Sequence, residues 1–270
     1  MKKKIIKYYS KNLYHEISPD FIHLPGLHDH YDFKNIIYGE YEKNKSKFIK
    51  PNNINIVTCA TEEYDSILID QCNYMNIDYI NAYQVYENKE KLNPWKNSNK
   101  LYVYRNIFNK FLKDDIIVLL DSRDVLIYGF DNIRKINKNI LKNNIIFSTS
   151  LYNYPLIFNN IVNKRNYRNL FQVNLNSGVI IGKQKTLINL FDDAINILES
   201  GKYNDIKLNN IYLFSDQYIF KCLRESEKYG RKIILDELSD IIFTANGFDI
   251  KENEDEIIFE SPQNLQLKIV

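Results

Sequence analysis

The chain has 270 residues, of which 44% are hydrophobic and 14% aromatic, enough for one large α/β domain with a sizeable core. Its 36 Lys and Arg residues against 34 Asp and Glu residues give a net charge of +2. This balance argues against nucleic acid as an obligatory partner, because proteins that bind the phosphate backbone usually show a clear basic excess. The abundance of Lys, Ile, Asn and Tyr is typical of an AT-rich genome, such as that of a giant DNA virus or a low-GC microbe.

No targeting or membrane segment is predicted. The basic start MKKKIIKYYSKNLYHE lacks the apolar stretch of a signal peptide, and no later run approaches the length of a membrane span. Cys59, Cys72 and Cys222 lie far apart without a CxxC pair, which favours a reducing compartment. We therefore expect a soluble, intracellular, cytoplasmic protein.

Short apolar runs alternate with helical patterns along the chain. The predicted strands lie at 53–60, 78–84, 116–121, 143–150 and 173–182. The predicted helices lie at 63–75, 104–113 and 185–200, with a fourth from Ser215, which can cap it, to before Gly230. Gly201 is expected to end the third helix. The alternation predicts an α/β domain over 53–270 with a mostly parallel central sheet flanked by helices, preceded by an N-terminal segment over 1–52.

Two carboxylates follow one of the most apolar runs in the chain. Residues 116–120, IIVLL, predict a strand covered on both faces, Asp121 closes it, and Asp124 follows three residues on. Ligands of open α/β sheets bind outside the carboxyl ends of strands, and acids at this spacing can converge on one divalent cation that bridges a diphosphate. The alternative is an ordinary turn with two solvated acids. A phosphatase with an aspartyl nucleophile is disfavoured, because its second Asp would occupy position 123, which is Arg.

Two later segments add polar groups. Asn176, Ser177 and Gly178 interrupt an apolar strand-like run, and a Gly within a strand usually marks a bulge or a close approach by another group. Asp216 and Gln217 open the fourth predicted helix, where backbone N–H groups favour a carboxylate. Taken alone, the latter pair is explained by simple helix capping before catalysis.

The segments LLDSRDVLIYG, NLNSGVIIG and SDQYIF, in this order, resemble the glycosyltransferase domain of multifunctional lysyl hydroxylases and the related procollagen galactosyl- and glucosyltransferases. Weaker similarity follows the same order in VTCATEE (57–63), PWKNSNK (94–100), FSTSLYNYP (147–155) and SDIIFTANGFD (239–249). The resemblance covers about residues 53 to 260. It implies a GT-A fold that binds a UDP-sugar with Mn²⁺ and transfers the sugar to a hydroxyl.

The resemblance also implies roles for single residues. Asp121 and Asp124 match metal ligands, and Asp216 with Gln217 matches the acceptor-side acid and its neighbour. The positions that match the surroundings of the nucleotide and sugar are Thr58, Thr61, Trp95, Lys100, Arg123, Asn176, Ser177 and Gly178.

Several of these matches depart from the family or allow a plainer interpretation. Arg123 replaces a Tyr that stacks on uracil, although a guanidinium can also stack on a base. Asn153 and Tyr154 replace the Cys and Trp of a Cys-Trp-Pro segment. Without the resemblance, Trp95 would be interpreted as a loop anchor and Lys100 as a solvated surface residue.

A third metal ligand is missing from its family position. The family domain closes with a strand that leads to His-Gly-Asn-Gly, whereas here no His follows residue 30. DFIHLPG (20–26) reproduces the spacing of that motif, with two apolar residues, His23, and a Gly three further on. We therefore predict a circular permutation in which His23 completes the metal site. The alternatives are a zinc site with His28 and His30, or ordinary surface histidines.

The combined expectation is a Mn²⁺-dependent glycosyltransferase. It would move a hexose or N-acetylhexosamine from a UDP-sugar to an acceptor hydroxyl on a collagen-like protein, a glycan or a small molecule. Asp216 would act as base in an inverting reaction, or position the acceptor in a retaining one. The alternatives are a nucleotide-sugar hydrolase, a nucleotidyltransferase, and a degenerate domain that binds nucleotide-sugar or a partner protein without turnover.

Overall fold

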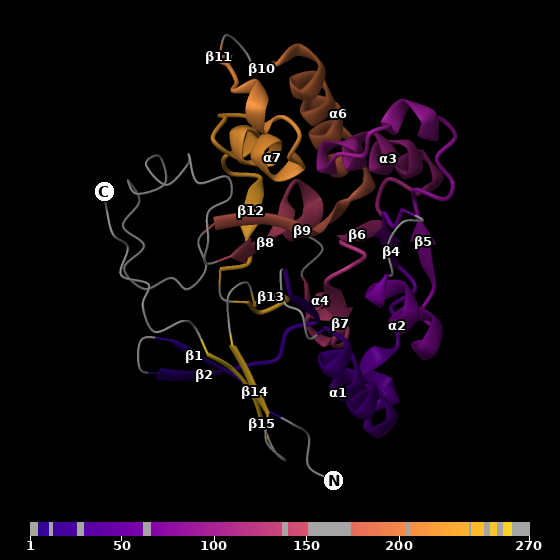
Figure 1. Ribbon diagram of the computed structural model, residues 1–270, viewed down its shortest axis with the longest axis vertical. Helices are drawn as coiled ribbons and strands as arrows, with labels where there is room; N and C mark the ends of the chain where they lie inside the picture. The colour runs from indigo at the N-terminus through magenta and orange to yellow at the C-terminus, as the bar shows by residue number, and fades with distance from the viewer. Residues whose placement is uncertain are drawn as a thin grey trace.

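The computed structural model describes residues 5–10, 13–25, 30–61, 66–136, 140–150, 174–203, 206–237, 239–245, 249–252 and 256–260. At its centre lies a six-stranded sheet in the order β12-β8-β9-β6-β4-β5 (Figure 1). Its strands are β4 (Ile54–Thr58), β5 (Tyr79–Asn81), β6 (Ile116–Leu120), β8 (Ile145–Ser150), β9 (Asn174–Lys183) and β12 (Ile233–Leu235).

All strands of this sheet except β9 run in the same direction. The pairs β4–β5, β4–β6 and β8–β12 are parallel, whereas β9 is antiparallel to both β6 and β8. Five strands therefore share one edge for their carboxyl ends, and β9 begins at that edge. The predicted α/β class with a mostly parallel central sheet is confirmed.

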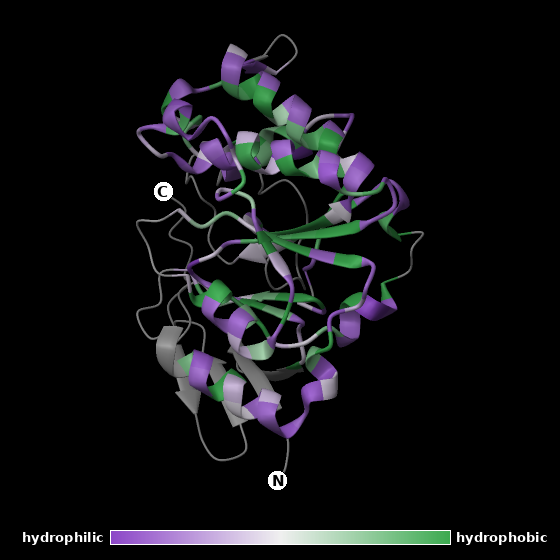
Figure 2. Cartoon of the chain, turned by 90° about the vertical axis from the view of Figure 1, so that its right-hand side faces the viewer, coloured by the Kyte–Doolittle hydropathy of each residue, from purple (hydrophilic) through white to green (hydrophobic). Residues whose placement is uncertain are grey.

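Helices cover both faces of the sheet, as Figure 2 shows in side view. One layer contains α3 (Lys100–Ile107), α6 (Gln184–Ser200) and α7 (Asp216–Arg224), and the other contains α1 (His30–Lys43), α2 (Ile67–Met75) and α4 (Asp131–Lys135). Successive residues of a strand point to opposite faces. Accordingly Val118 packs in the core on the α1 side, and its neighbours Ile117 and Leu119 pack in the core on the α6 side. The prediction that 116–120 is covered on both faces is confirmed.

Most predicted elements lie where the sequence placed them. The bounds of α3 are an exception, since the helix begins four residues before the predicted 104 and gives way to a 3-10 turn at Phe108. The prediction overlooked Leu101, which is buried with Tyr104 and Phe108 at helical spacing. The 3-10 turn at Phe108 is η4 (Phe108–Lys110), and the others in the described residues are η1 (Lys45–Phe48), η2 (Lys89–Leu92), η3 (Asn97–Asn99), η5 (Ile140–Lys142) and η7 (Asn210–Tyr212).

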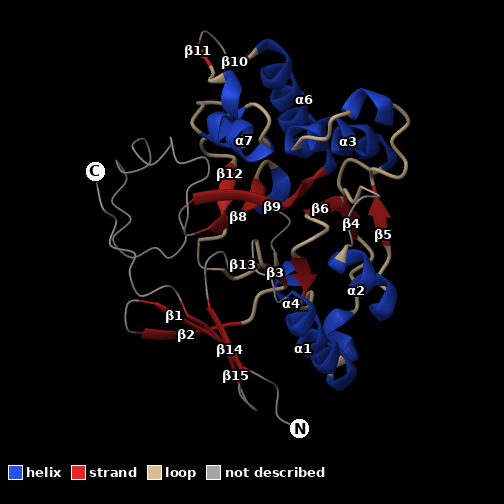
Figure 3. Ribbon diagram, viewed as in Figure 1, coloured by secondary structure: helices blue, strands red, loops and turns tan. Residues whose placement is uncertain are grey.

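The N-terminal segment pairs with distant parts of the chain. β3 (Phe21–His23) is parallel to β13 (Ile242–Thr244) and antiparallel to β7 (Val125–Ile127). Figure 3 shows a separate four-stranded sheet, β14-β15-β1-β2. Its strands are β1 (Ile5–Ser10), β2 (Leu13–Ile17), β14 (Asp249–Glu252) and β15 (Glu256–Glu260), and a short hairpin joins β10 (Lys202–Tyr203) to β11 (Ile206–Lys207).

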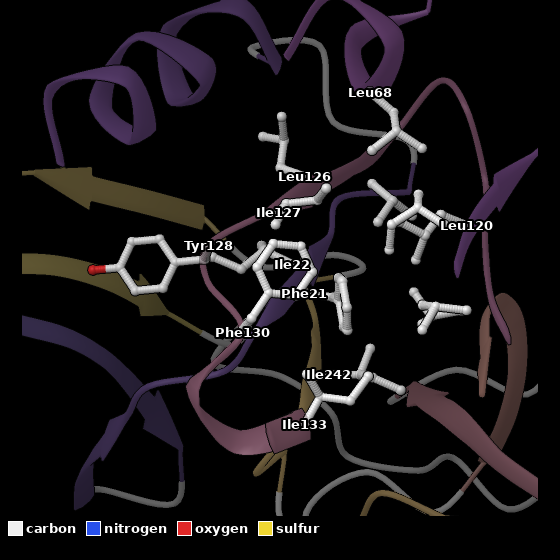
Figure 4. Close-up of a cluster of buried hydrophobic side chains, with 14 of the residues drawn as sticks. Phe21, Ile22, Leu68, Leu120, Leu126, Ile127, Tyr128, Phe130, Ile133 and Ile242 are labelled. Carbon is white, nitrogen blue, oxygen red and sulfur yellow. The ribbon is translucent and has the colours of Figure 1, made fainter. Parts of the chain in front are cut away.

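Strand β3 is fixed by burial and by hydrogen bonds. Figure 4 shows Phe21 and Ile22 among the buried side chains of the neighbouring strands and α4. Both are fully buried, and each such side chain contributes roughly 1.5–3 kcal/mol. The adjacent Asp20 carboxylate accepts hydrogen bonds from the N–H groups of Asn132 and Ile133 at the start of α4. These contacts fix the position of His23, the last residue of β3.

Candidate active site

The turn that carries the two predicted acids is anchored on both sides. The N–H of Asp121 donates to the carbonyl of Gly178 on β9 at 2.8 Å. On the other side, the Ser66 hydroxyl at the start of α2 donates to the carbonyl of Ser122 at 2.9 Å. The turn lies at the carboxyl end of β6. It leads directly into β7, which is antiparallel to β3. Both carboxylates are therefore presented at the edge where ligands of α/β sheets bind.

Strand β3 brings His23 to these acids. His23 pairs with Val125, the first residue of β7, so its side chain lies beside Asp124. Its Nε2 atom is 3.3 Å from Oδ1 of Asp124, and one ligand atom from each of His23, Asp121 and Asp124 lies within 4.8 Å of the others. The histidine is 2% exposed. The three predicted ligands thus converge although about a hundred residues separate His23 from the acids.

Gly178 makes room for the imidazole. A Cβ atom at this position would lie 2.5 Å from Nδ1 and 2.6 Å from Nε2 of His23, far inside van der Waals contact. The pairing of β8 with β9 shifts register between Phe147 and Ser148, so β9 bulges around Gly178. The predicted bulge and close approach are both confirmed, and the approaching group is a predicted ligand.

The chemistry of these three side chains fits a small divalent cation. One imidazole nitrogen with two carboxylates is a donor set that suits Mn²⁺ and similar ions. Nδ1 of the buried His23 has no hydrogen-bond partner among the described residues. Burial favours the neutral imidazole, but the carboxylates of Asp124 and Asp121 outweigh it and raise the pKa of His23. The two carboxylates therefore favour a positive charge at His23.

Lys100 links two of the acids. Its Nζ atom lies 2.5 Å from Oδ1 of Asp121. Burial disfavours the ammonium, but the negative charges of Asp121 and Asp216 raise the pKa of Lys100 well above its usual value. Lys100 is therefore charged, and the interpretation as a solvated surface lysine is wrong.

Asp216, the second acid whose charge acts on Lys100, lies in the first turn of α7. Ser215 caps the helix as predicted, accepting from the N–H of Tyr218 at 3.4 Å. The N–H of Gln217 donates to Asp216 Oδ1 at 2.9 Å, and the Gln217 side-chain oxygen accepts from the N–H of Ser177 at 3.3 Å. Burial raises the pKa of Asp216 to about 6, against the opposing effect of Lys100. Asp216 thus contributes to capping and also faces the charged site.

A pocket of about 370 Å³ opens over the acidic turn. It is lined by the predicted residues Thr61, Trp95, Lys100, Asp121, Arg123 and Asp124, and by Cys59, Asn97 and Ser122. The last three were missed, because a single such residue carries no spacing signal, although Cys59 follows the predicted Thr58 and Ser122 follows the predicted Asp121. Trp95 packs edge-to-face on Tyr83 with ring centroids 5.5 Å apart, so it is both a loop anchor and a pocket wall.

Other predicted residues lie beside the pocket and not in its lining. Thr58 is fully buried, and its hydroxyl donates to the carbonyl of Leu120 at 2.8 Å, which joins β4 to β6. Asn176 is used within the bulge, where its Oδ1 accepts from the N–H of Gly178 at 2.8 Å and from the Ser148 hydroxyl at 3.0 Å. Asn153, Tyr154 and His28 lie outside the described residues.

Comparisons with models of known protein families and with curated proteins find no match for this chain. The resemblance to procollagen glycosyltransferases stays a prediction that rests on the order of the motifs. Among the described helices, none has the length and apolar character needed to cross a lipid bilayer.

Proposed function

We propose that this protein is a metal-dependent glycosyltransferase that uses a UDP-sugar donor and a hydroxyl acceptor. The observation that carries the proposal is the convergence of His23 with Asp121 and Asp124 at the carboxyl edge of the sheet. Two acids in a turn have an ordinary explanation. A buried histidine that a distant strand brings to them, in space left by a glycine, supports a cation site in preference to that explanation.

His23, Asp121 and Asp124 would hold the divalent ion. When bound, such an ion neutralises the charge that develops on a departing diphosphate. Lys100 supplies a second, fixed positive charge next to Asp121 and is suited to bind a phosphate oxygen. The chain itself therefore offers a positively charged environment for UDP as a leaving group.

The rim of the pocket supplies candidates for the nucleobase and sugar. Trp95 and the exposed Arg123 both line the pocket, and both side chains can stack on a planar base. Asn97 and Thr61 offer hydrogen bonds to polar groups of the donor. These contacts would orient the donor, and orientation is a large part of catalysis when two substrates meet.

Asp216 is the candidate acceptor-side acid. Its pKa of about 6 leaves it mostly ionised at neutral pH, yet close enough to neutrality to accept a proton from a hydroxyl. The carboxylate is held by Gln217 and by a hydrogen bond from the Ser177 side chain. It could serve as base in an inverting reaction or position the acceptor in a retaining one.

The test is the release of UDP from a panel of UDP-sugars with Mn²⁺, with and without hydroxyl acceptors such as hydroxylysine peptides and simple sugars. Acceptor-dependent release supports the transferase, and equal release without any acceptor supports a nucleotide-sugar hydrolase.

A second candidate is a domain that binds nucleotide-sugar without turnover. The 2.5 Å contact of Lys100 with Asp121 favours it, because an ammonium can replace the charge of a metal ion but not its chemistry. This candidate predicts that UDP-sugars raise the unfolding temperature without any UDP release, and that EDTA leaves this effect unchanged.

A further inference from the structure

A second pocket lies at the opposite edge of the central sheet. It encloses about 770 Å³, and six lysines line it: Lys113, Lys142, Lys183, Lys185, Lys228 and Lys232. They come from the loops that precede β6, β8 and β12 and from the end of β9 with the start of α6. These residues are distant in sequence, and the sheet topology brings them around one hollow.

Carboxylates balance only part of this charge. Lys183 pairs with Asp114 at 2.8 Å, and Lys228 pairs with Asp193 at 2.5 Å. No carboxylate partner is found for the other four lysines in the part of the chain that the structure describes. Four positive charges around one hollow are notable in a chain whose net charge is only +2, and a bound anion would reduce their mutual repulsion.

Tyr229 lines the hollow and is held by hydrogen bonds. Tyr229 is 2% exposed, and its hydroxyl donates to the carbonyl of Asn189 at 2.9 Å and contacts Asp193 at 2.6 Å. The ammonium groups of Lys228 and Lys232 lie 5.3 and 5.7 Å from the centre of the Tyr229 ring, within the range of cation–π attraction. At least part of the lysine array is thus held in place.

The start of α6 adds to the positive potential. This helix of 17 residues begins at Gln184, directly after Lys183, and its first turn contains no acidic residue. The N-terminus of a helix carries partial positive charge and unpaired N–H groups, which favour phosphate. Lys185 and Thr186 from this turn line the hollow, so the positive potential of the helix start adds to the charge of the lysines. The N–H of Gln184 itself already donates to the carbonyl of Asp115 at 3.1 Å.

We propose that this hollow binds a compact anion that carries several phosphate groups. Lysine ammonium groups suit phosphate as point charges. They surround a half-open hollow of limited volume instead of forming a stripe along the surface, which favours a small polyanion over a nucleic-acid chain.

The hollow is separate from the candidate active site. Lys183 pairs with Ile116 at the start of β6, whereas Asp121 follows the other end of that strand. The five residues of β6 span roughly 13–17 Å at about 3.3 Å per residue. A small anion in the hollow therefore cannot touch the acids, and the inference does not depend on the proposed glycosyltransferase activity.

Calorimetric titration of the full chain with tripolyphosphate tests the proposal. EDTA removes divalent ions from the acidic site, and a salt concentration of about 50 mM keeps the screening of surface charges low. We expect binding that weakens as salt increases. The variant Lys113→Gln/Lys142→Gln/Lys185→Gln should bind about tenfold more weakly, because three exposed charge contacts are removed.

The matched control is Lys91→Gln/Lys135→Gln/Lys202→Gln, which removes three equally exposed lysines outside the hollow. It should bind tripolyphosphate within about twofold of the unmodified chain. Both variants should unfold at the same temperature as the parent. Undetectable binding to the parent, equal loss in both variants, or tighter binding of a short RNA than of tripolyphosphate at equal phosphate concentration would overturn the proposal.

Discussion

The two edges of the central sheet handle charge in opposite ways. At the carboxyl edge, His23, Lys100, Asp121 and Asp216 are largely buried, and positive and negative groups lie in contact. At the amino edge, the lysines of the second pocket are mostly exposed and of one sign. Buried opposite charges interact strongly, at fixed geometry, whereas exposed like charges act through a weak field that salt screens.

This contrast has consequences for mutation. Removal of one charge at the carboxyl edge leaves its partner buried without a counter-charge, which lowers the free energy of unfolding. Removal of one charge at the amino edge is compensated by water and salt. We therefore expect larger effects from substitutions at the carboxyl edge than from substitutions at the amino edge.

The largest effect is expected at the acidic turn. Asp121→Asn or Asp124→Asn should reduce Mn²⁺-dependent turnover of UDP-sugar by more than about 100-fold, because each keeps its size but loses the charge that holds the ion. The control Asp78→Asn changes an exposed acid and should leave turnover unchanged. Near-normal activity of either site variant at saturating metal and donor would contradict the metal assignment.

A single methyl group at Gly178 should disturb the same site from behind. Gly178→Ala forces His23 to move and should cost about 1–3 kcal/mol of unfolding free energy while weakening Mn²⁺ binding. Gly39→Ala is the matched control, since a Cβ there meets nothing within 4 Å and sits in α1, where Ala stabilises a helix by about 1 kcal/mol. Urea unfolding and Mn²⁺ titration measure both quantities, and identical behaviour of the two variants would remove the role given to Gly178.

Asp216→Asn should lower turnover by about 100-fold with little change in UDP affinity, as expected of a group on the acceptor side. Turnover of the parent protein should fall as pH drops through about 6, because Asp216 then becomes protonated. An equal loss of UDP binding in the variant would show a structural or metal-binding role.

The raised pKa of Asp216 also predicts how the stability of the fold depends on pH. Its pKa is higher in the folded chain than the 3.8 of an ordinary Asp, so folding favours the protonated form and ionisation costs stability as pH rises from about 4 to about 6. Asp216→Asn removes this cost. Thermal unfolding should therefore shift in favour of the variant between pH 4 and pH 7, and a pH-independent difference would contradict the buried ionisation.

The smallest effect is expected for Asp114→Asn at the amino edge. Asp114 is 88% exposed and pairs with Lys183 at 2.8 Å, so its loss should change unfolding free energy by less than about 1 kcal/mol. Tripolyphosphate should bind the variant more tightly, since a competing carboxylate is gone. Weaker binding would show that Asp114 positions Lys183 for the anion.

The elements that could be predicted from sequence carry strong local signals. The continuous apolar run of β6, the helical spacing of α6 and the stop at Gly201, whose φ is 64°, each follow from neighbouring residues. Ser215 as a cap and Gly178 as a bulge are also local, since they depend on hydrogen bonds and space within a few residues.

The features that could not be predicted depend on distant pairing or on isolated residues. The four-stranded sheet joins β1 to β15 across the whole chain, and no local pattern specifies that partner. Helix α1 was not predicted, because its sequence is largely polar. His23 could be proposed only from a motif spacing in the resembling family, whereas its contact with Asp124 depends on the register of β3 against β7.

The position of β3 also bears on the order of folding. During synthesis His23 emerges early, but its strand pairs with Ile242–Thr244, more than two hundred residues later. Contacts of such sequence separation form late, because a long loop must close first. The sheet from β4 to β9 and the pairing of β3 with β7 can form on the ribosome before β13 exists, so a nascent chain can already bring His23 to Asp124. Pairing with β13 then closes the second edge of β3, and a chain that lacks Ile242–Thr244 would hold His23 through one neighbouring strand only.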